Sequence, residues 1–208
     1  MNEGVFTYRI DREDVITRVS KNWVFFARAN AWGSDYRPED VVGKRLWDFI
    51  EGDETRQLYD IVLRRVREGQ RCGPIPFRCD SPLERRSLEL FLAPLPDGQI
   101  EFTSTIIRTE RRDDPIMLLD SHVDRSEATV RICSMCKKMA TSPDRWVEVE
   151  EGLSRLRLFD AVEMPRLTHG VCPGCYHGVV DGPADPRAPE TPHTEGGEQD
   201  ELPDAGSQ

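Results

Sequence analysis

The chain has 208 residues, of which 38% are hydrophobic and 32% are charged, and its formal net charge is −10. This length allows one large domain or two small ones, and no run approaches the roughly 18–20 apolar residues that a membrane-spanning helix needs. The N-terminal segment is acidic and lacks the basic start and apolar centre of a signal peptide. We therefore expect a cytoplasmic protein with no membrane contact, whose cysteines stay reduced.

The negative charge is concentrated at the C-terminus. Residues 181–208 contain eight acidic residues and one basic residue, Arg187, so they carry −7 and the other 180 residues carry −3. This segment is rich in Pro and Gly and nearly free of large apolar residues, which predicts a disordered acidic tail. The nearly balanced remainder has no basic stripe, which argues against nucleic acid as a partner.

Alternating apolar residues predict β-strands at both ends of the first 110 residues. The segment FTYRI at 6–10 places Phe6, Tyr8 and Ile10 on one face, and residues 14–20 follow closely enough to pair with it as a hairpin. Three more strands are predicted at 73–80, 85–95 and 99–110, with a Pro-Asp-Gly turn at 96–98.

Helical spacing of apolar residues fills the middle of the same region. Helices are predicted at 21–33 and, most clearly, at 53–70, where Leu58 and Val62 belong to an apolar stripe; a short one is predicted within 41–50. Two strands, several helices and three strands in this order predict an α+β fold, in which helices pack on one face of an antiparallel sheet.

This element order, with the segments VVGKRLWDFI (41–50) and FRCDSPLERRSLELFLAPLPDGQIEF (77–102), resembles a PAS domain of the bacterial signalling type. The resemblance covers residues 5–110, about half of the chain. It implies a five-stranded antiparallel sheet that encloses a pocket with its helices. PAS domains use that pocket for haem, flavin, small metabolites or nothing, and many of them dimerise, so a homodimer through this domain is expected.

The sequence disfavours haem and flavin but does not identify the pocket ligand. Residues 1–121 contain no histidine, so the usual axial ligand of haem is missing. A flavin photosensor of the light-oxygen-voltage type carries an Asn-Cys-Arg-Phe-Leu-like run, which is absent, and Cys79 lies in a predicted strand. Four aromatic residues are candidates for a pocket wall, although such residues more often form ordinary core: Trp23, Trp32, Trp47 and Phe49.

The polar segment CDSPLERR (79–86) is predicted to be a loop between two strands. Its Arg85 and Arg86 are expected to lie on the solvated surface, with an anion or a partner's carboxylate as the alternative. Cys72 and Cys79 are expected to be small packing residues.

Two Cys-x-x-Cys pairs stand in the second half, Cys133 with Cys136 and Cys172 with Cys175. Each such turn presents two sulfurs to one point, and Zn²⁺ takes four thiolates tetrahedrally. Two pairs within about 45 residues predict a structural zinc site with these four ligands. Residues 145–159 between the pairs are expected to supply a strand and a helix.

The surroundings of the two pairs differ. The first, ICSMCKK, is typical of a knuckle between strands. The second, GVCPGCYHGVV, is typical of the start of a helix, where N–H groups stabilise a thiolate. This arrangement resembles a treble-clef zinc finger. The runs ICSMCKKM, RWVEVEEGL and LTHGVCPGCY also resemble a cysteine module found after PAS or receiver domains in bacterial signalling proteins, over residues 131–178.

Other roles for the cysteines remain open. The same four thiolates accept iron, and a pair of thiols can serve as a redox switch, but a thioredoxin-like centre would need a βαβ fold that the sequence does not indicate. His169 lies three residues before Cys172 and is expected to be either a hydrogen-bond donor to the site or a turn residue rather than a metal ligand.

The sequence therefore divides into a PAS domain at 1–110, a linker at 111–130, a four-cysteine zinc-binding module at 131–180 and a tail at 181–208. The expected function is a non-enzymatic cytoplasmic signalling protein, whose PAS domain binds a ligand or dimerises and whose zinc module presents a surface to a partner protein. Without an output domain in the chain, regulation is expected to act through that partner. The alternative is a thiol-based redox or metal sensor, in which the cysteine cluster itself responds.

Overall fold

The computed structural model describes residues 4–29, 37–159, 161 and 163–182. The predicted disordered tail, apart from Asp181 and Gly182, lies outside these residues, as does Trp32. Within the described ranges, no helix has both the length and the apolar character needed to cross a membrane.

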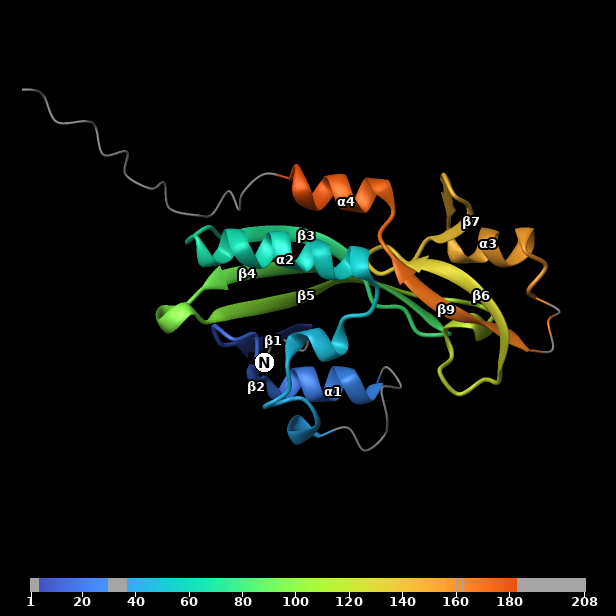
Figure 1. The fold of residues 1–208 in the computed structure, drawn as a ribbon. Coiled ribbons are helices and arrows are strands. Elements are labelled where there is room, and N and C mark those ends of the chain that lie inside the picture. The colour runs from blue at the N-terminus through green and yellow to red at the C-terminus, as the bar shows by residue number, and fades with distance from the viewer. Residues whose placement is uncertain (1–3, 30–36, 160, 162, 183–208) are drawn as a thin grey trace, which may run out of the picture.

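The N-terminal half forms one five-stranded sheet (Figure 1). Its strands lie in the order β2-β1-β5-β4-β3, and every neighbouring pair is antiparallel. This confirms the predicted α+β fold. The strands are β1 (Val5–Ile10), β2 (Ile16–Val19), β3 (Cys72–Arg78), β4 (Glu84–Pro94) and β5 (Ile100–Arg111).

The alternation in the sequence decides which face of the sheet is buried. Leu88, Leu90 and Leu92 of β4 point into the core, and Ile100 and Phe102 of β5 do the same. The predicted turn between these strands is the 3-10 turn η3 (Pro96–Gly98). The side-chain period of a strand is two residues, so this register places the whole apolar set on one side.

Two helices and two short turns pack on that buried side. They are α1 (Lys21–Ala29), η1 (Pro38–Asp40), η2 (Leu46–Phe49) and α2 (Asp53–Arg67). The inner face of α2 consists of Leu58, Val62, Leu63 and Val66, each nearly inaccessible to solvent. Acidic residues in its first turn and arginines in its last turn complement the helix dipole.

The C-terminal half builds a second, four-stranded sheet in the order β8-β7-β6-β9 (Figure 1). Strands β6 and β9 run parallel, which the sequence did not predict. A short turn, η4 (Met117–Leu119), precedes this sheet. The remaining elements are β6 (Arg125–Cys133), β7 (Met139–Ser142), β8 (Arg145–Val147), α3 (Val149–Arg155), β9 (Met164–Gly170) and α4 (Pro173–Val180).

The predicted linker, 111–130, is largely structured. Strand β6 already begins at Arg125, and Ile116 and Leu118 are buried in the core of the second sheet. That core is completed by Met139, Val149, Leu153 and Met164.

A larger core joins the two halves. It contains the inward residues of the first sheet and α2 together with Cys133, Met135, Val171, Cys172 and Val179 of the second half. Helix α4 lies along α2 (Figure 1), and Arg65 of α2 donates to the carbonyl oxygen of Val180 at 2.7 Å. The two halves therefore share apolar packing.

The polar segment 79–86 takes part in the same junction. The expectation of solvated arginines there is wrong for Arg86, which is only 7% exposed. The carboxylate of Asp80 is fully buried and pairs with Arg78 and Arg112. Arg85 pairs with Glu150 of α3 at 2.9 Å. For Arg85, a carboxylate in the other half of the chain thus replaces solvent, whereas Arg86 pairs with Glu84 of its own strand.

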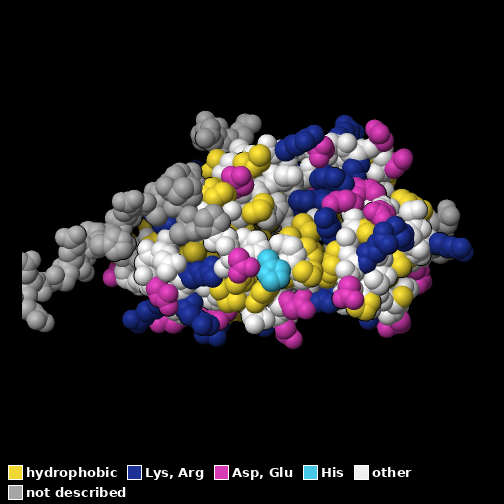
Figure 2. Space-filling view, turned by 90° about the horizontal axis from the view of Figure 1, so that it is seen from above, with side chains coloured by type: hydrophobic (Ala, Val, Ile, Leu, Met, Phe, Trp, Pro, Cys, Tyr) yellow, Lys and Arg dark blue, Asp and Glu magenta, His cyan; other side chains and the backbone are white. Residues whose placement is uncertain are grey.

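The surface outside this junction carries mixed charge. Figure 2 shows Lys and Arg side chains interleaved with Asp and Glu side chains over the face seen from above, with apolar side chains between them.

Candidate metal centre and adjoining cavity

The first cysteine pair lies on the tight turn between β6 and β7. Cys133 is the last residue of β6, and its carbonyl oxygen accepts a hydrogen bond from Lys137 N–H at 3.0 Å. The N–H of Cys133 in turn donates to the carbonyl oxygen of Lys138 at 2.8 Å. Lys137 turns the chain with a φ of 61°. Residues 133–138, which we call the knuckle, form a closed loop, as predicted.

The second pair lies at the start of α4. Cys172 is the N-cap residue, Pro173 occupies the first helical position, and Cys175 lies in the first turn. A proline is favourable there because its missing N–H would have no partner in the helix. The N–H of Cys172 points back at the first pair and donates to Cys133 Sγ at 3.4 Å.

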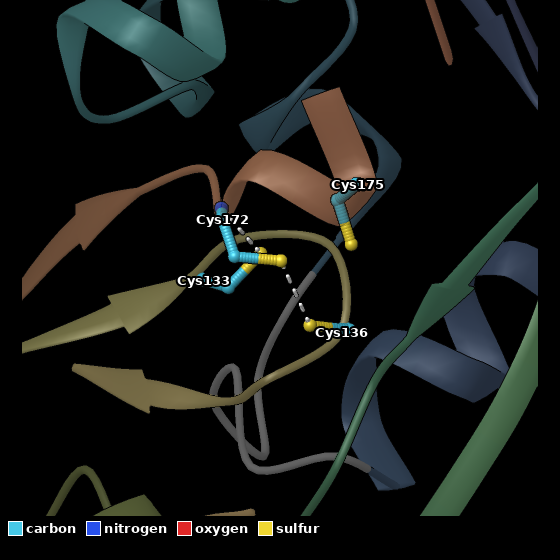
Figure 3. A group of neighbouring side chains, drawn as sticks. All are labelled: Cys133, Cys136, Cys172 and Cys175. Carbon is cyan, nitrogen blue, oxygen red and sulfur yellow. Dashed lines mark hydrogen bonds between the residues drawn. The ribbon is translucent and has the colours of Figure 1, made fainter. Parts of the chain in front are cut away.

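The structure brings all four predicted cysteines together (Figure 3). Their sulfur atoms lie within 4.8 Å of one another, and Cys136 Sγ lies 3.7 Å from Cys172 Sγ. A tetrahedral zinc with Zn–S bonds of about 2.3 Å separates its sulfurs by about 3.8 Å. The cluster therefore fits Zn²⁺, and equally a four-thiolate iron; which metal it binds stays a prediction.

The thiols perturb one another strongly. Hydrogen bonds from the thiols of Cys136 and Cys175 hold the pKa of Cys133 far below its usual range. Contact with the Cys133 sulfur raises the pKa of Cys136 to about 12. Contacts with the sulfurs of Cys133 and Cys136 raise the pKa of Cys175 as well. A divalent metal would offset the mutual repulsion of four thiolates at this spacing.

The knuckle is also attached to the first half of the chain. Arg78 N–H, at the end of β3, donates to the carbonyl oxygen of Met135 at 2.7 Å. The hydroxyls of Thr55 and Ser134 lie 2.8 Å apart. Near the second pair, the carboxylate of Glu54 accepts a hydrogen bond from Val171 N–H at 2.9 Å. Residues of β3 and α2 thus contact the metal-site loops directly.

A cavity of about 460 Å³ adjoins this junction. The first sheet, α1 and α2 supply most of its wall, with side chains that include Tyr8, Trp23 and Phe77. Of the aromatic residues proposed from the sequence, Trp23 and Phe49 line it. Trp47 is instead packed against the core and donates to Asp14 Oδ2 at 2.7 Å.

Module residues also line the cavity, which the sequence gave no means of predicting. They are Ser134, Met135 and Lys137 of the knuckle and His169 of β9. His169 does not join the four-sulfur cluster. Its Nδ1 is buried 3.0 Å from Glu51 Oε2, within ion-pair distance but without the angle of a hydrogen bond.

The position of His169 alters the argument about haem. Residues 1–121 contain no histidine, but the fold brings an imidazole from the second half to the cavity wall. The lack of histidine in the first half therefore does not exclude a histidine-ligated group. Cys79, which also lines the cavity, follows β3 rather than lying on a helix.

Comparison with known proteins found no matching family model and no matching curated protein. Solved structures resemble about half of the chain. One is a domain of an HTR-like protein from Haloarcula marismortui, with 14% identity and a TM-score of 0.33, over 50% of this chain and 98% of that one.

Two more are sensor domains. The photoactive yellow protein domain of the sensor histidine kinase Ppr from Rhodospirillum centenum has 18% identity and a TM-score of 0.35, over 49% of this chain and 91% of its own. The Aer2 receptor from Vibrio cholerae, a dual PAS-haem oxygen sensor, has 11% identity and a TM-score of 0.34, over 50% of this chain and 95% of that one. Likeness at this level assigns no ligand or partner to this chain.

Proposed function

We propose that this chain is a non-enzymatic sensory protein. Its first half holds a small molecule in the cavity, and a structural zinc ion at Cys133, Cys136, Cys172 and Cys175 organises a second half that presents a surface to a partner protein. The supporting observation is the position of the cavity, whose wall contains residues of both halves, including the knuckle. A ligand there would contact the sensory and the metal-bound parts at once.

The zinc would supply structural stability. Binding to four thiolates favours the folded state because the unfolded chain offers no preformed site. The knuckle and the start of α4 hold these thiolates, and Cys133 and Cys172 are buried. Four sulfurs fill the four coordination positions of a tetrahedral zinc, which supports a structural rather than a catalytic metal.

The first experiment is metal analysis and absorption spectroscopy of protein purified anaerobically without added metal. We expect about one zinc per chain, and its loss in Cys133→Ser and Cys172→Ser together with unfolding of the second half. Cys72→Ser is the matched control, since Cys72 lies on β3 outside the cluster. Metal-free protein that is folded like the wild type would refute the structural zinc.

The same preparation separates the alternatives. A haem band in the visible spectrum that is lost in His169→Leu would identify haem as the occupant of the cavity. Iron at the cysteines, or release of the metal by mild peroxide with a change of assembly, would favour the redox or metal sensor over the structural site.

A further inference from the structure

The cavity has an apolar body and one polar end. The body is aromatic and aliphatic, and among its wall residues are Phe6, Tyr8, Trp23, Phe26, Tyr59 and Leu90. The polar end, where the wall passes between the two halves, consists of Glu51, Thr55, Ser134, Lys137 and His169, and Ser104 of β5 is a further polar residue of the wall. A molecule that fills such a space buries an apolar part and keeps a polar group at one end.

Contacts within the polar end place it at the seam between the two halves. Thr55 lies against Ser134, and His169 lies against Glu51. The side chain of Glu51 is 77% exposed, so this end of the cavity meets solvent. A ligand would therefore direct its polar group towards the seam and the knuckle.

Lys137 is the cation in this end that lacks a carboxylate partner. Its Nζ donates to the carbonyl oxygen of Ser134 at 2.9 Å, and it forms no ion pair with any residue that the structure describes. Glu51 faces His169 instead. The neighbouring Cys79 does not supply a negative charge, because burial raises the pKa of its thiol. A zinc ion with four thiolates would carry a net charge of about −2 next to Lys137 in the sequence. A carboxylate in the cavity would give the ammonium a direct, hydrogen-bonded counter-charge.

The knuckle fixes the position of this ammonium. Lys137 directly follows the metal ligand Cys136, and its N–H is bonded to the carbonyl of Cys133. Met135, between the two cysteines, is 5% exposed and belongs to the shared core. A metal bound to the sulfurs of both knuckle cysteines would also fix the positions of Ser134, Met135 and Lys137, which line the cavity.

We infer that the cavity binds an apolar molecule carrying a single carboxylate, that Lys137 holds this carboxylate, and that metal and ligand bind cooperatively through the knuckle. This inference rests on the proposed function, since it names the ligand class of that sensory cavity. Coupling between two sites is reciprocal, so metal must raise ligand affinity by the factor by which ligand raises metal affinity.

The test is calorimetric titration of the full zinc-loaded chain with naphthaleneacetate and its neutral amide, naphthaleneacetamide. These probes share an apolar body and differ in charge. We expect the carboxylate to bind at least about tenfold more tightly, as a charge-assisted hydrogen bond allows. Lys137→Met should remove this preference, whereas Lys138→Met, the matched control, should keep it. Ser104→Phe should block both probes by filling the cavity.

The second readout is zinc affinity, measured by competition with a chromogenic chelator with and without saturating naphthaleneacetate. We expect the probe to tighten zinc binding in the wild type and in Lys138→Met, and to do so less in Lys137→Met. An unchanged zinc affinity in the wild type would overturn the cooperative part of the inference.

The outcomes also distinguish the inference from the proposed function. Equal binding of both probes, or a carboxylate preference that survives Lys137→Met, would overturn the assignment of the ligand while leaving a sensory cavity. Absence of binding by both probes would likewise overturn the ligand assignment. The structural zinc of the proposed function is refuted separately, by metal-free protein that is folded like the wild type. Binding that persists in Ser104→Phe would place the probes outside the cavity and overturn the inference.

Discussion

The buried carboxylate of Asp80 offers the sharpest test of how the two halves are joined. Its side chain is fully buried and accepts hydrogen bonds from the guanidinium groups of Arg78 and Arg112, the latter at 2.6 Å. The substitution Asp80→Asn keeps the shape and removes the charge. It leaves two guanidinium groups that are only 11% and 9% exposed without their central counter-charge.

Breaking a buried ion pair by neutralising one partner costs about 3–5 kcal/mol. Here the remaining carboxylates reduce that cost, because Arg78 keeps Glu148 at 2.7 Å and Arg112 keeps Glu150 at 3.0 Å. Both of those carboxylates are partly exposed. We therefore expect Asp80→Asn to lower the free energy of unfolding by about 3 kcal/mol, the lower end of this range.

The measurement is urea unfolding of the zinc-loaded chain followed by circular dichroism. The control is Asp60→Asn, because Asp60 pairs with Arg64 on the exposed face of α2 and such a pair contributes about 0–1 kcal/mol. In a double-mutant cycle, Arg112→Met should cost much less in the Asp80→Asn background than in the wild type. A loss below about 1 kcal/mol for Asp80→Asn, or additive losses, would refute the network as a link between the halves.

Three further changes test this junction and the core of the second sheet. Gly52 has a φ of 84°, and a Cβ there would lie 2.5 Å from a carbonyl oxygen of β9. Gly52→Ala should therefore lower the free energy of unfolding in urea by about 1–3 kcal/mol more than Gly69→Ala does. Gly69 is the control because a Cβ there meets nothing within 4 Å. Leu118→Ala, in the core of the second sheet, should cost about 2–5 kcal/mol by the same assay. A hydrogen bond from Arg131 lowers the pKa of Glu54, so its stabilising effect is present above the unfolded pKa of about 4.3 and is lost as pH falls through the folded pKa. Glu54→Gln should therefore reduce stability at neutral pH and flatten its acid dependence, whereas an unchanged acid profile would contradict this role.

Local patterns were sufficient for the first sheet and for the two cysteine pairs. The two-residue alternation of Leu88, Leu90 and Leu92 depends only on neighbouring residues, as does the apolar stripe of α2. The Cys-x-x-Cys spacing is equally local, because each turn positions its own pair of sulfurs. These features were predicted from the sequence at nearly the bounds that the structure gives.

The parallel pairing of β6 with β9 had no such signal. The two strands are joined through β7, β8 and α3, and the middle of β6 is exposed on successive residues, so alternation is weak. The burial of Arg86 and Asp80 was missed for a related reason. A charged run is ordinarily solvated. Its burial is favourable here because the fold closes ion pairs around it, some with residues close in the sequence, such as Arg78 and Glu84, and others with residues of distant segments, such as Arg112.

The knuckle shows why the cavity could not be read from the sequence either. Metal binding fixes the type of residue only at Cys133 and Cys136, and it leaves the residues between and after them unconstrained. Met135 occupies the shared core, and Lys137 lines the cavity. If the cysteines hold a metal as proposed, its release would free a loop that carries a core side chain of the first half. Metal binding and the packing of the first half would then be energetically coupled. Such coupling would depend on Met135 and Lys137, which lie between and after two of the proposed ligands and are not specified by the Cys-x-x-Cys spacing.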